Sequence, residues 1–354
     1  MPMSKLADWF ENRLGISVIS KFLTHKEIPQ HKHTIWYYTG SAILLFLAIQ
    51  IVTGILLAFF YRPTLEQAHE SVVRIVTEIP LGWIIRSIHG WSANFMIAIV
   101  LVHLLSIWLT KSYRKPREIT WMSGVMLLFI SLAFGFTGYL LPWDELSLSA
   151  TKVGTDIPNA IPVVGQWVTQ LLRGGPDITG DTLTRFYAFH ISVLPIFIFL
   201  FLGLHIYLIQ KHGVSKPLEA EKEQKKLPSI PFWPNFVYRE SIVWALLLGG
   251  LLTIALFSPH HLGEPADLMA PAPAGIQPEW YFLFLFQLLK LFPGHILFLK
   301  GETLAVLLIA AGAAAFFFLP VIDNKPAEKK GKIITYAGWL FILFAVVLSV
   351  WSLL

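Results

Sequence analysis

The sequence predicts an all-α integral membrane protein with seven transmembrane helices, and three observations support this fold class. Of the 354 residues, 55% are hydrophobic and only 14% are charged, which is not the balance of a soluble protein. Seven apolar stretches are candidates to cross the hydrocarbon core, which is about 30 Å thick. Basic residues are concentrated in alternate connections between these stretches, as the positive-inside rule requires.

The first element expected is an amphipathic helix on the membrane surface. Residues 1–34 lack the pattern of a signal peptide, and apolar residues such as Trp9 and Phe10 are mixed with charged ones such as Lys5 and Glu11. This mixture favours a helix that lies on the cytoplasmic side of the membrane. A frayed polar start to the first span is the alternative.

Seven spans follow. They cover residues 35–60, 81–110, 119–141, 186–209, 241–257, 304–322 and 333–354. The fifth is short for a crossing. The apolar run 281–292 is shorter still, follows Pro278 and ends in a Pro-Gly pair, so we expect a half-buried or re-entrant helix there.

The positions of the basic residues predict the orientation. The N-terminal segment and the connections 111–117, 211–239 and 325–332 hold 19 of the 27 Lys and Arg residues. This places the N-terminus and these connections in the cytoplasm, with the chain in the inner (cytoplasmic) membrane. The net charge of +5 therefore reflects topology and not nucleic-acid binding. Because the chain has no cysteine, it forms no disulfide, iron–sulfur ligation or covalent haem link.

Four histidines lie inside the second and fourth spans, where an imidazole is costly to insert. His89 and His103 are fourteen residues apart and His190 and His205 fifteen, so each helix presents two imidazoles on one face, about 21 Å apart in depth. The pattern predicts a four-helix bundle with two bis-histidine haem sites, His89 with His190 toward the outside and His103 with His205 toward the inside. Hydrogen-bonded packing residues are the alternative.

Glycines and arginines could complete these sites. Gly40 and Gly54 in the first span repeat the fourteen-residue interval, as do Gly124 and Gly138 in the third, so we expect them to leave room for the flat haem rings. Close helix packing is the alternative.

Arg86 and Arg185 precede the two outer histidines by three and five residues. Either guanidinium could bind a haem propionate, or could simply reach the membrane interface.

A carboxylate motif follows a proline-rich loop. In the segment PEWY at 278–281, Glu279 opens the short apolar helix and Trp280 and Tyr281 follow it. A carboxylate beside an apolar cavity could accept a proton from a hydroxylated ring. The alternative is an acid that only complements the helix dipole.

The sequence resembles the cytochrome b subunit of the cytochrome bc family of quinol oxidoreductases over essentially its whole length. The segments that carry the resemblance are PEWY at 278–281, GYLLPWD at 138–144 and RSIH at 86–89. The fifteen-residue histidine spacing and Asp144 resemble the plastid and cyanobacterial branch. There the haem subunit and the three-helix subunit are separate chains, whereas this chain looks like their fusion.

The resemblance implies a domain division. A cytoplasmic-side segment at 1–34 precedes a di-haem bundle at 35–212, a linker at 213–240 and a three-helix domain at 241–354.

The resemblance also implies a bifurcated oxidation. Quinol near Glu279 would give one electron to a Rieske iron–sulfur partner and the other to the outer haem, which passes it inward to a quinone; the implied quinol-binding residues are Tyr139, Pro278, Trp280 and Tyr281. A c-type cytochrome subunit, the membrane quinone pool, the lipid bilayer and a homodimer of the complex are the further partners implied.

Two departures from the family pattern bear on the haems. Tyr38 stands where the plastid-type protein carries a cysteine that fixes an extra haem, and Ser106 stands where many relatives carry an arginine. Lys211 is then the candidate partner for the inner propionates.

Two other functions compete. A di-haem cytochrome b anchor of a dehydrogenase has no need of the PEWY motif or the last three spans, and a transporter with broken helices leaves the four histidines unexplained.

Overall fold

The computed structural model describes residues 3–15, 17, 24–216, 218, 227–270, 275–296, 299–325 and 328–354. Within these residues, six helices are long and apolar enough to cross a membrane: Thr34–Ala58, Gly82–Leu109, Glu118–Leu140, Gly180–His212, Phe232–Phe257 and Gly331–Leu353. The predicted all-α membrane class is confirmed. The count of seven is not reached by this criterion, because the stretch 304–322 does not form one long helix.

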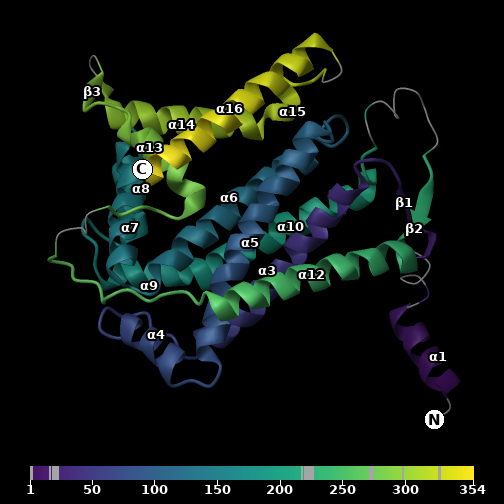
Figure 1. Cartoon of the computed structure of the whole chain (residues 1–354), viewed down its shortest axis with the longest axis horizontal. Coiled ribbons are helices and arrows are strands. Elements are labelled where there is room, and N and C mark those ends of the chain that lie inside the picture. Colours follow the sequence, from purple (N-terminus) through teal and green to yellow (C-terminus); the bar gives the residue numbers. More distant parts are fainter. Residues whose placement is uncertain are drawn as a thin grey trace.

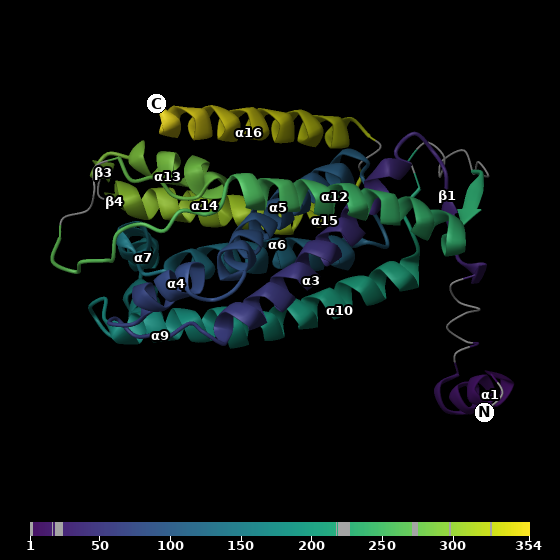
Figure 2. The same ribbon diagram turned by 60° about the horizontal axis from the view of Figure 1, so that its bottom comes forward.

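Four long helices form a bundle. Helix α3 (Tyr38–Ala58) packs on α5 (Gly82–Leu109), α5 packs on α6 (Glu118–Leu140), and α6 packs on α10 (Leu194–His212). Figures 1 and 2 show these helices side by side. Their middle stretches are apolar almost without interruption, which favours burial in a bilayer over an amphipathic surface.

The fourth span is longer and less regular than the predicted 186–209. It begins with α9 (Gly180–Ala188) and passes through a π-helical turn, Phe189–Val193, before α10 begins. Pro195 in the first turn of α10 cannot donate a backbone hydrogen bond, which favours a local widening of the helix. The turn contains His190, so the irregularity coincides with a predicted site residue.

The C-terminal helices lie against the bundle. Helix α12 (Val237–Phe257) packs on α5 and α3, and both α14 (Gly301–Phe317) and α15 (Leu319–Ile322) contact α6. The last helix, α16 (Lys329–Leu353), packs on α13 (Leu283–Lys290) and lies along the side of the molecule opposite to α10 (Figure 2).

Three stretches of this region differ from the predicted bounds. Helix α12 starts four residues before the predicted 241 because Arg239 and Glu240 fit in its polar first turn. The stretch 304–322 is divided at Phe318, whose backbone is not helical, just before Pro320. The short helix expected at 281–292 is present, as the turn η5 (Trp280–Phe282) followed by α13.

Short elements close the two ends of the bundle. The helices α4 (Ala68–Thr77), α7 (Glu145–Asp156) and α8 (Gly165–Arg173), none predicted, lie in the connections at one end. At the other end β1 (Glu27–Pro29) pairs antiparallel with β2 (Ser229–Pro231), which joins the N-terminal segment to the chain before α12. The hairpin strands β3 (His295–Ile296) and β4 (Leu299–Lys300) precede α14.

The expected amphipathic segment contains α1 (Met3–Leu14), which stands apart from the bundle (Figure 1). Residues 16 and 18–23 of this segment, and residues 217 and 219–226 of the expected linker, lie outside the described residues.

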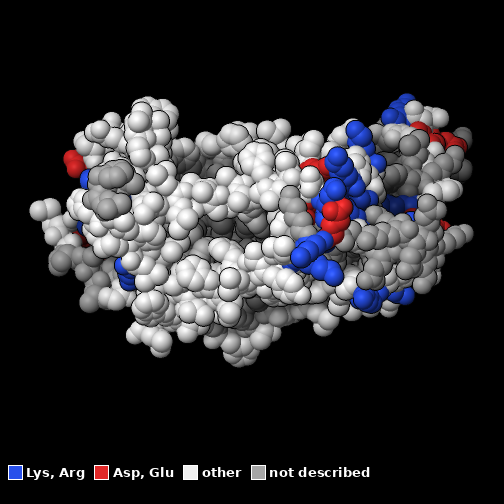
Figure 3. All heavy atoms as spheres, turned by 90° about the horizontal axis from the view of Figure 1, so that it is seen from above, with Lys and Arg blue, Asp and Glu red and all other residues white. Residues whose placement is uncertain are grey.

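We call the end that holds β1, the α5–α6 connection and the start of α16 the inner end, and the opposite end the outer end. Figure 3 shows the Lys and Arg side chains of one face gathered toward the inner end, with a wide zone free of charged residues over the middle. This distribution is typical of a multi-pass membrane protein.

Candidate functional site

The outer pair of histidines faces each other across the bundle. His89 on α5 and His190 in the π turn have ring centroids 6.4 Å apart, with planes inclined at 70°. The Nδ1 atom of His89 lies 2.8 Å from the Thr53 hydroxyl, and that of His190 lies 2.9 Å from the Thr137 hydroxyl. Each ring is therefore held by a hydroxyl from the neighbouring helix.

The inner pair is held in the same way. Thr39 lies 2.7 Å from Nδ1 of His103, and Ser123 lies 2.9 Å from Nδ1 of His205. The two imidazoles lie within electrostatic range of each other.

The hydroxyls fix the tautomer of all four imidazoles. Each hydroxyl donates its single proton to a backbone carbonyl three or four residues earlier in the chain. The acceptors are the oxygens of Trp36, Ile49, Thr120 and Ala133, at 2.6–2.9 Å. A hydroxyl that has donated its proton can only accept from the histidine, so Nδ1 carries the hydrogen in every ring. The lone pair of Nε2 is then available as a metal ligand, which is the usual arrangement of ligating histidines.

Each predicted glycine lies against one of these imidazoles. A methyl group added at Gly54 would lie 3.2 Å from Cε1 of His89, and one at Gly138 would lie 2.8 Å from Cε1 of His190. For the inner pair, Gly40 and Gly124 approach the Cε1 atoms of His103 and His205, at 3.8 and 3.2 Å. At each position the missing side chain lets the neighbouring helix approach closely and also leaves room for the imidazole, so the two interpretations of the glycines do not exclude each other.

The four hydroxyls were not predicted, although the chain carries a signal for them. Each hydroxyl residue directly precedes one of the glycines, so the dipeptides Thr39-Gly40, Thr53-Gly54, Ser123-Gly124 and Thr137-Gly138 repeat along two helices. The hydroxyl holds the ring and the glycine makes room for it.

The geometry fits a planar haem better than a bare metal ion. Within the described residues, no group of three or more His, Cys, Asp or Glu side chains is placed to hold a metal. A metal–nitrogen bond of about 2 Å, with about 1.1 Å from nitrogen to ring centre, puts two imidazoles on opposite sides of one metal about 6.3 Å apart. The ring centres of the outer pair are 6.4 Å apart, which matches this distance, so His89 and His190 would be able to hold the iron of a haem between them.

Two of the three candidate propionate partners, Arg86 and Arg185, are bound to backbone carbonyls. Arg86 donates from Nη1 to the carbonyl of His260 at 2.7 Å and from Nη2 to that of His261 at 3.1 Å. Arg185 donates to the carbonyl of Leu171 at 2.8 Å, and Lys211 is exposed at the end of α10. Arg86 thus fixes the chain after α12 beside His89, whereas Arg185 joins α9 to α8.

His260 was not predicted. Its imidazole lies against Gly90, where a side chain would collide with it, and its ring centroid is 5.0 Å from that of Trp91. Burial, and then the Arg86 cation, lowers the pKa of His260, so the ring is neutral at pH 7. Because His260 lies in the loop after α12 and not in a span, the spacing pattern that identifies the four other histidines does not include it.

The PEWY segment lies between α5 and α6 at the outer end. The indole of Trp280 donates to Asn94 of α5 at 2.7 Å, and the Tyr281 hydroxyl fills the space that Gly135 leaves open on α6. The Glu279 carboxylate makes no capping hydrogen bond to the turn that it opens, and it is in electrostatic range of Tyr139 and Tyr281. Burial raises the pKa of Glu279. Its neighbour Pro278 is half-buried.

Asp144 holds the loop that leads to this segment. Its carboxylate accepts from the backbone and hydroxyl of Ser147, at 2.8 and 2.7 Å, and caps α7. The other carboxylate oxygen accepts from the backbone of Gly263 at 3.2 Å. The end of α6 and the loop after α12 are therefore fixed together.

Two family models match the chain. The one described as "Cytochrome b/b6/petB" matches residues 23–213, and the one described as "Cytochrome b(C-terminal)/b6/petD" matches residues 265–354.

Individual proteins are similar over comparable lengths. The cytochrome bc complex cytochrome b subunit of Chlorobaculum thiosulfatiphilum is 42% identical, over 97% of this chain and 79% of its own. Cytochrome b6 of Acaryochloris marina is 46% identical, over 61% of this chain and its whole length. A solved structure titled "Hyperthermophilic respiratory Complex III" superposes with a TM-score of 0.87 at 27% identity, over 98% of this chain and 91% of that one.

A side chain at Gly138 should remove the outer haem alone. In Gly138→Val, the new atoms fall on the His190 ring, 2.8 Å from where Cβ would stand, so we expect the purified protein to keep the inner haem and lose the outer one. Reduced-minus-oxidised spectra measure both. Gly203→Val is the matched control, because a Cβ there meets nothing within 4 Å. Full haem content in Gly138→Val would contradict the assignment.

The hydroxyl at Thr137 should tune the outer haem. Thr137→Val removes the acceptor for Nδ1 of His190, which makes the imidazole a weaker donor to iron. We expect the midpoint potential of the outer haem to rise in a redox titration, while that of the inner haem stays unchanged. Thr253→Val on α12, whose hydroxyl also donates to its own helix but meets no histidine, is the control.

Proposed function

Because the chain belongs to the cytochrome b family, as the multi-pass cytochrome b subunit of a bc-type quinol oxidoreductase complex, we propose that it carries electrons from a quinol site at its outer end to a quinone site at its inner end. The observation that supports this most directly is the common Nδ1–H tautomer of His89, His190, His103 and His205. Four imidazoles with Nε2 free to bind a metal, in an outer and an inner pair, suit two non-covalent b haems.

The two pairs have defined roles in this proposal. His89 and His190 would hold the outer haem, and His103 and His205 the inner one. Such a bis-histidine haem would supply one-electron transfer. The neutral imidazoles keep their orientation through the four hydroxyls. Arg86 and Arg185 at the outer end and Lys211 at the inner end are the proposed partners of the haem propionates, because they lie within six residues of His89, His190 and His205.

Glu279 is the proton acceptor for quinol in this proposal. Oxidation of one quinol releases two electrons and two protons. One electron goes to a Rieske iron–sulfur protein and then to a c-type cytochrome subunit, and the other enters the b chain. The uncapped Glu279 carboxylate takes one proton from a quinol hydroxyl, and both protons of the quinol are released outside. Tyr139, Pro278, Trp280 and Tyr281 are the proposed quinol-binding residues.

The inner quinone site is assigned to a cavity at the end of α10. This cavity, of about 350 Å³, is lined by His25, Lys26, Glu27, Ile209, Gln210, Gly213 and Val214. Lys26 donates to the side-chain oxygen of Gln210 at 3.0 Å, little more than one helical turn beyond His205. The site therefore offers polar groups for a quinone carbonyl close to the inner histidine pair.

The wider architecture follows from the same proposal. The bundle at 35–212, the linker at 213–240 and the C-terminal region at 241–354 are the functional divisions, and α14 with α15 makes the seventh crossing despite the break at Phe318. The N-terminus is on the cytoplasmic side of the inner membrane, where α1 lies on the surface. The complex is a homodimer.

Replacing the carboxylate of Glu279 tests the outer site. Since burial raises the pKa of Glu279, its deprotonated, proton-accepting form increases as pH rises above the ordinary carboxyl range, and the wild-type rate should rise with it. In Glu279→Gln we expect this pH dependence to disappear and quinol oxidation to slow by about 100-fold, with both haem spectra intact.

Glu302→Gln is the control for this variant. Glu302 is an acid at the start of a helix, as Glu279 is, but it is exposed. If both variants lose activity equally, or neither does, Glu279 only complements the helix dipole.

The inner site has its own test. Gln210→Leu removes the amide that Lys26 contacts, so we expect the inner haem, once reduced, to be reoxidised by quinone about tenfold more slowly. Reduction of the outer haem by quinol should stay normal. Gln170→Leu, on α8 at the outer end, is the control, and normal reoxidation in Gln210→Leu would exclude this cavity.

A further inference from the structure

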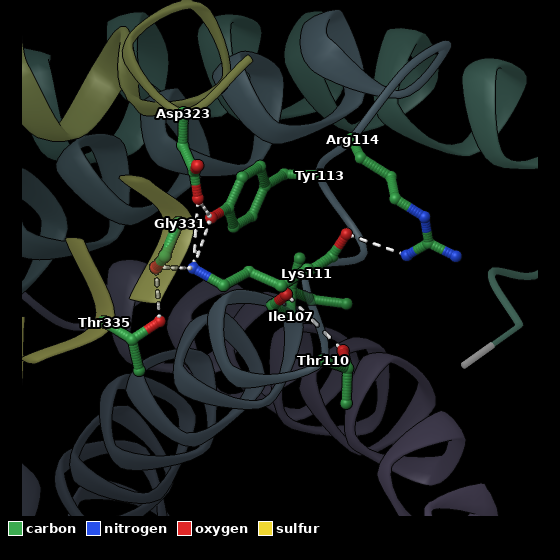
Figure 4. A network of polar contacts seen from close by, with 8 residues as sticks. All are labelled: Ile107, Thr110, Lys111, Tyr113, Arg114, Asp323, Gly331 and Thr335. Atoms are coloured by element: carbon green, nitrogen blue, oxygen red, sulfur yellow. Dashed lines mark hydrogen bonds and ion pairs between the residues drawn. The ribbon is translucent and has the colours of Figure 1, made fainter. Parts of the chain in front are cut away.

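A buried cluster of charged and polar groups lies at the inner end, outside the proposed haem and quinone sites (Figure 4). Lys111 donates from Nζ to Asp323 at 3.0 Å, to the Tyr113 hydroxyl at 3.1 Å and to the carbonyl of Gly331 at 3.3 Å. The Tyr113 hydroxyl also donates to Asp323, at 2.5 Å. Asp323 is 1% exposed and Lys111 8%, so the ion pair is almost fully withdrawn from water.

The chain makes this ion pair at a cost. Two charges lose their hydration, and replacing such a pair by apolar residues often leaves stability unchanged or improves it. Lys111 also has a φ of 56°, a backbone conformation that non-glycine residues rarely adopt. Burial, and then the hydrogen bond to Asp323, raises the pKa of Tyr113, so the phenol keeps the proton that it donates. These costs point to a role in specifying geometry rather than in stability.

The cluster joins the bundle to the last helix. Lys111 and Tyr113 lie in the α5–α6 connection, Asp323 lies between α15 and α16, and Gly331 is in the first turn of α16. Beneath it, Trp108 of α5 lies against Gly338 and its ring is 5.8 Å from that of Trp339. The polar contacts of Lys111 and the packing of Trp108 therefore hold the inner end of α16 against α5 and the connection that follows it.

The outer end of α16 is bound to the PEWY segment. Gln277 directly precedes this segment, two residues before Glu279. Its side chain donates to the carbonyl of Ser352 at 2.8 Å. From Gly331 to Ser352 the helix extends about 32 Å. Most of α16 is exposed, and it packs on α13, the helix that the PEWY segment opens. A displacement of its inner end would therefore be passed on to Gln277 and to α13.

We propose that Lys111 and Asp323 are positioning residues for the Glu279 segment, because they fix the register of α16 on the bundle. The inference rests on the proposed role of Glu279. Loss of the ion pair should therefore lower the rate of quinol oxidation at the opposite end of the molecule without lowering the stability of the protein.

The test is the apolar double variant Lys111→Met with Asp323→Leu in the intact complex. We expect both haems and the melting temperature to be retained, while kcat/KM for quinol oxidation falls about tenfold. Lys325→Met with Glu328→Leu is the control, since it removes an exposed ion pair of 3.2 Å from the same connection and should change nothing. A stable double variant with normal kcat/KM would overturn the proposal.

A double-mutant cycle tests the route through α16. Gln277→Leu cuts the outer contact of the helix, so its effect on kcat/KM should be smaller in the Lys111→Met, Asp323→Leu background than in the wild type. Full additivity would overturn the route.

A distance measurement separates this inference from the role of Glu279. Since the chain has no cysteine, spin labels at Glu78→Cys and Leu353→Cys report the position of α16 alone, and their distance distribution should broaden in the double variant. If that variant loses its haems, Tyr113→Phe takes its place. An unchanged distribution overturns the positioning role, whereas an inert Glu279→Gln overturns only the proposed proton acceptor.

Discussion

The bundle depends on one constraint: an imidazole inside an apolar helix pair must have an acceptor for its Nδ1 hydrogen. Buried polar groups without partners are too costly to keep. At each of the four positions a Thr or Ser of the facing helix is the acceptor, since its own proton is already donated to a helix carbonyl. The contact gives the Nδ1 hydrogen a partner and leaves Nε2 of each ring without a hydrogen.

The helix pairing follows from that contact. The hydroxyl-glycine dipeptides lie on α3 and α6, and the histidines lie on α5, on α10 and in the π turn before α10, so α3 must pack on α5 and α6 on the fourth span. A glycine next to each hydroxyl allows the approach, with Gly138 the tightest at 2.8 Å. The fourteen-residue interval of both glycine pairs nearly matches that of the histidines, which brings both depths into register at once. The four-helix bundle is thus specified by a repeated two-residue signal.

Much of this could be predicted from the sequence, and the failures have physical causes. Costly histidines stand out in apolar spans, so His89 and His190 could be paired from spacing and topology alone. Helices such as α4 and α7 were missed because a polar interfacial helix has neither the length nor the hydropathy of a span. The break at Phe318 was missed although Pro320 marks it. The Lys111 and Asp323 contact joins residues 212 positions apart, and no local pattern encodes such a pair.

The position of the ion pair follows from what the outer end must do. There α12 is bound to α5 through backbone carbonyls, as when Ser87 donates to Ala255 at 2.8 Å and Trp91 donates to Ser258 at 2.7 Å. The charged side chains that also hold this end, Arg86 and Asp144, have partners of their own, and the pKa of Glu279 is raised by burial. A buried acid beside Glu279 would raise its pKa further, and a buried lysine would lower it. The ion pair lies at the inner end of α16, a helix that extends about 32 Å from Gly331 to Ser352, so its charges are remote from the carboxylate that we propose it positions.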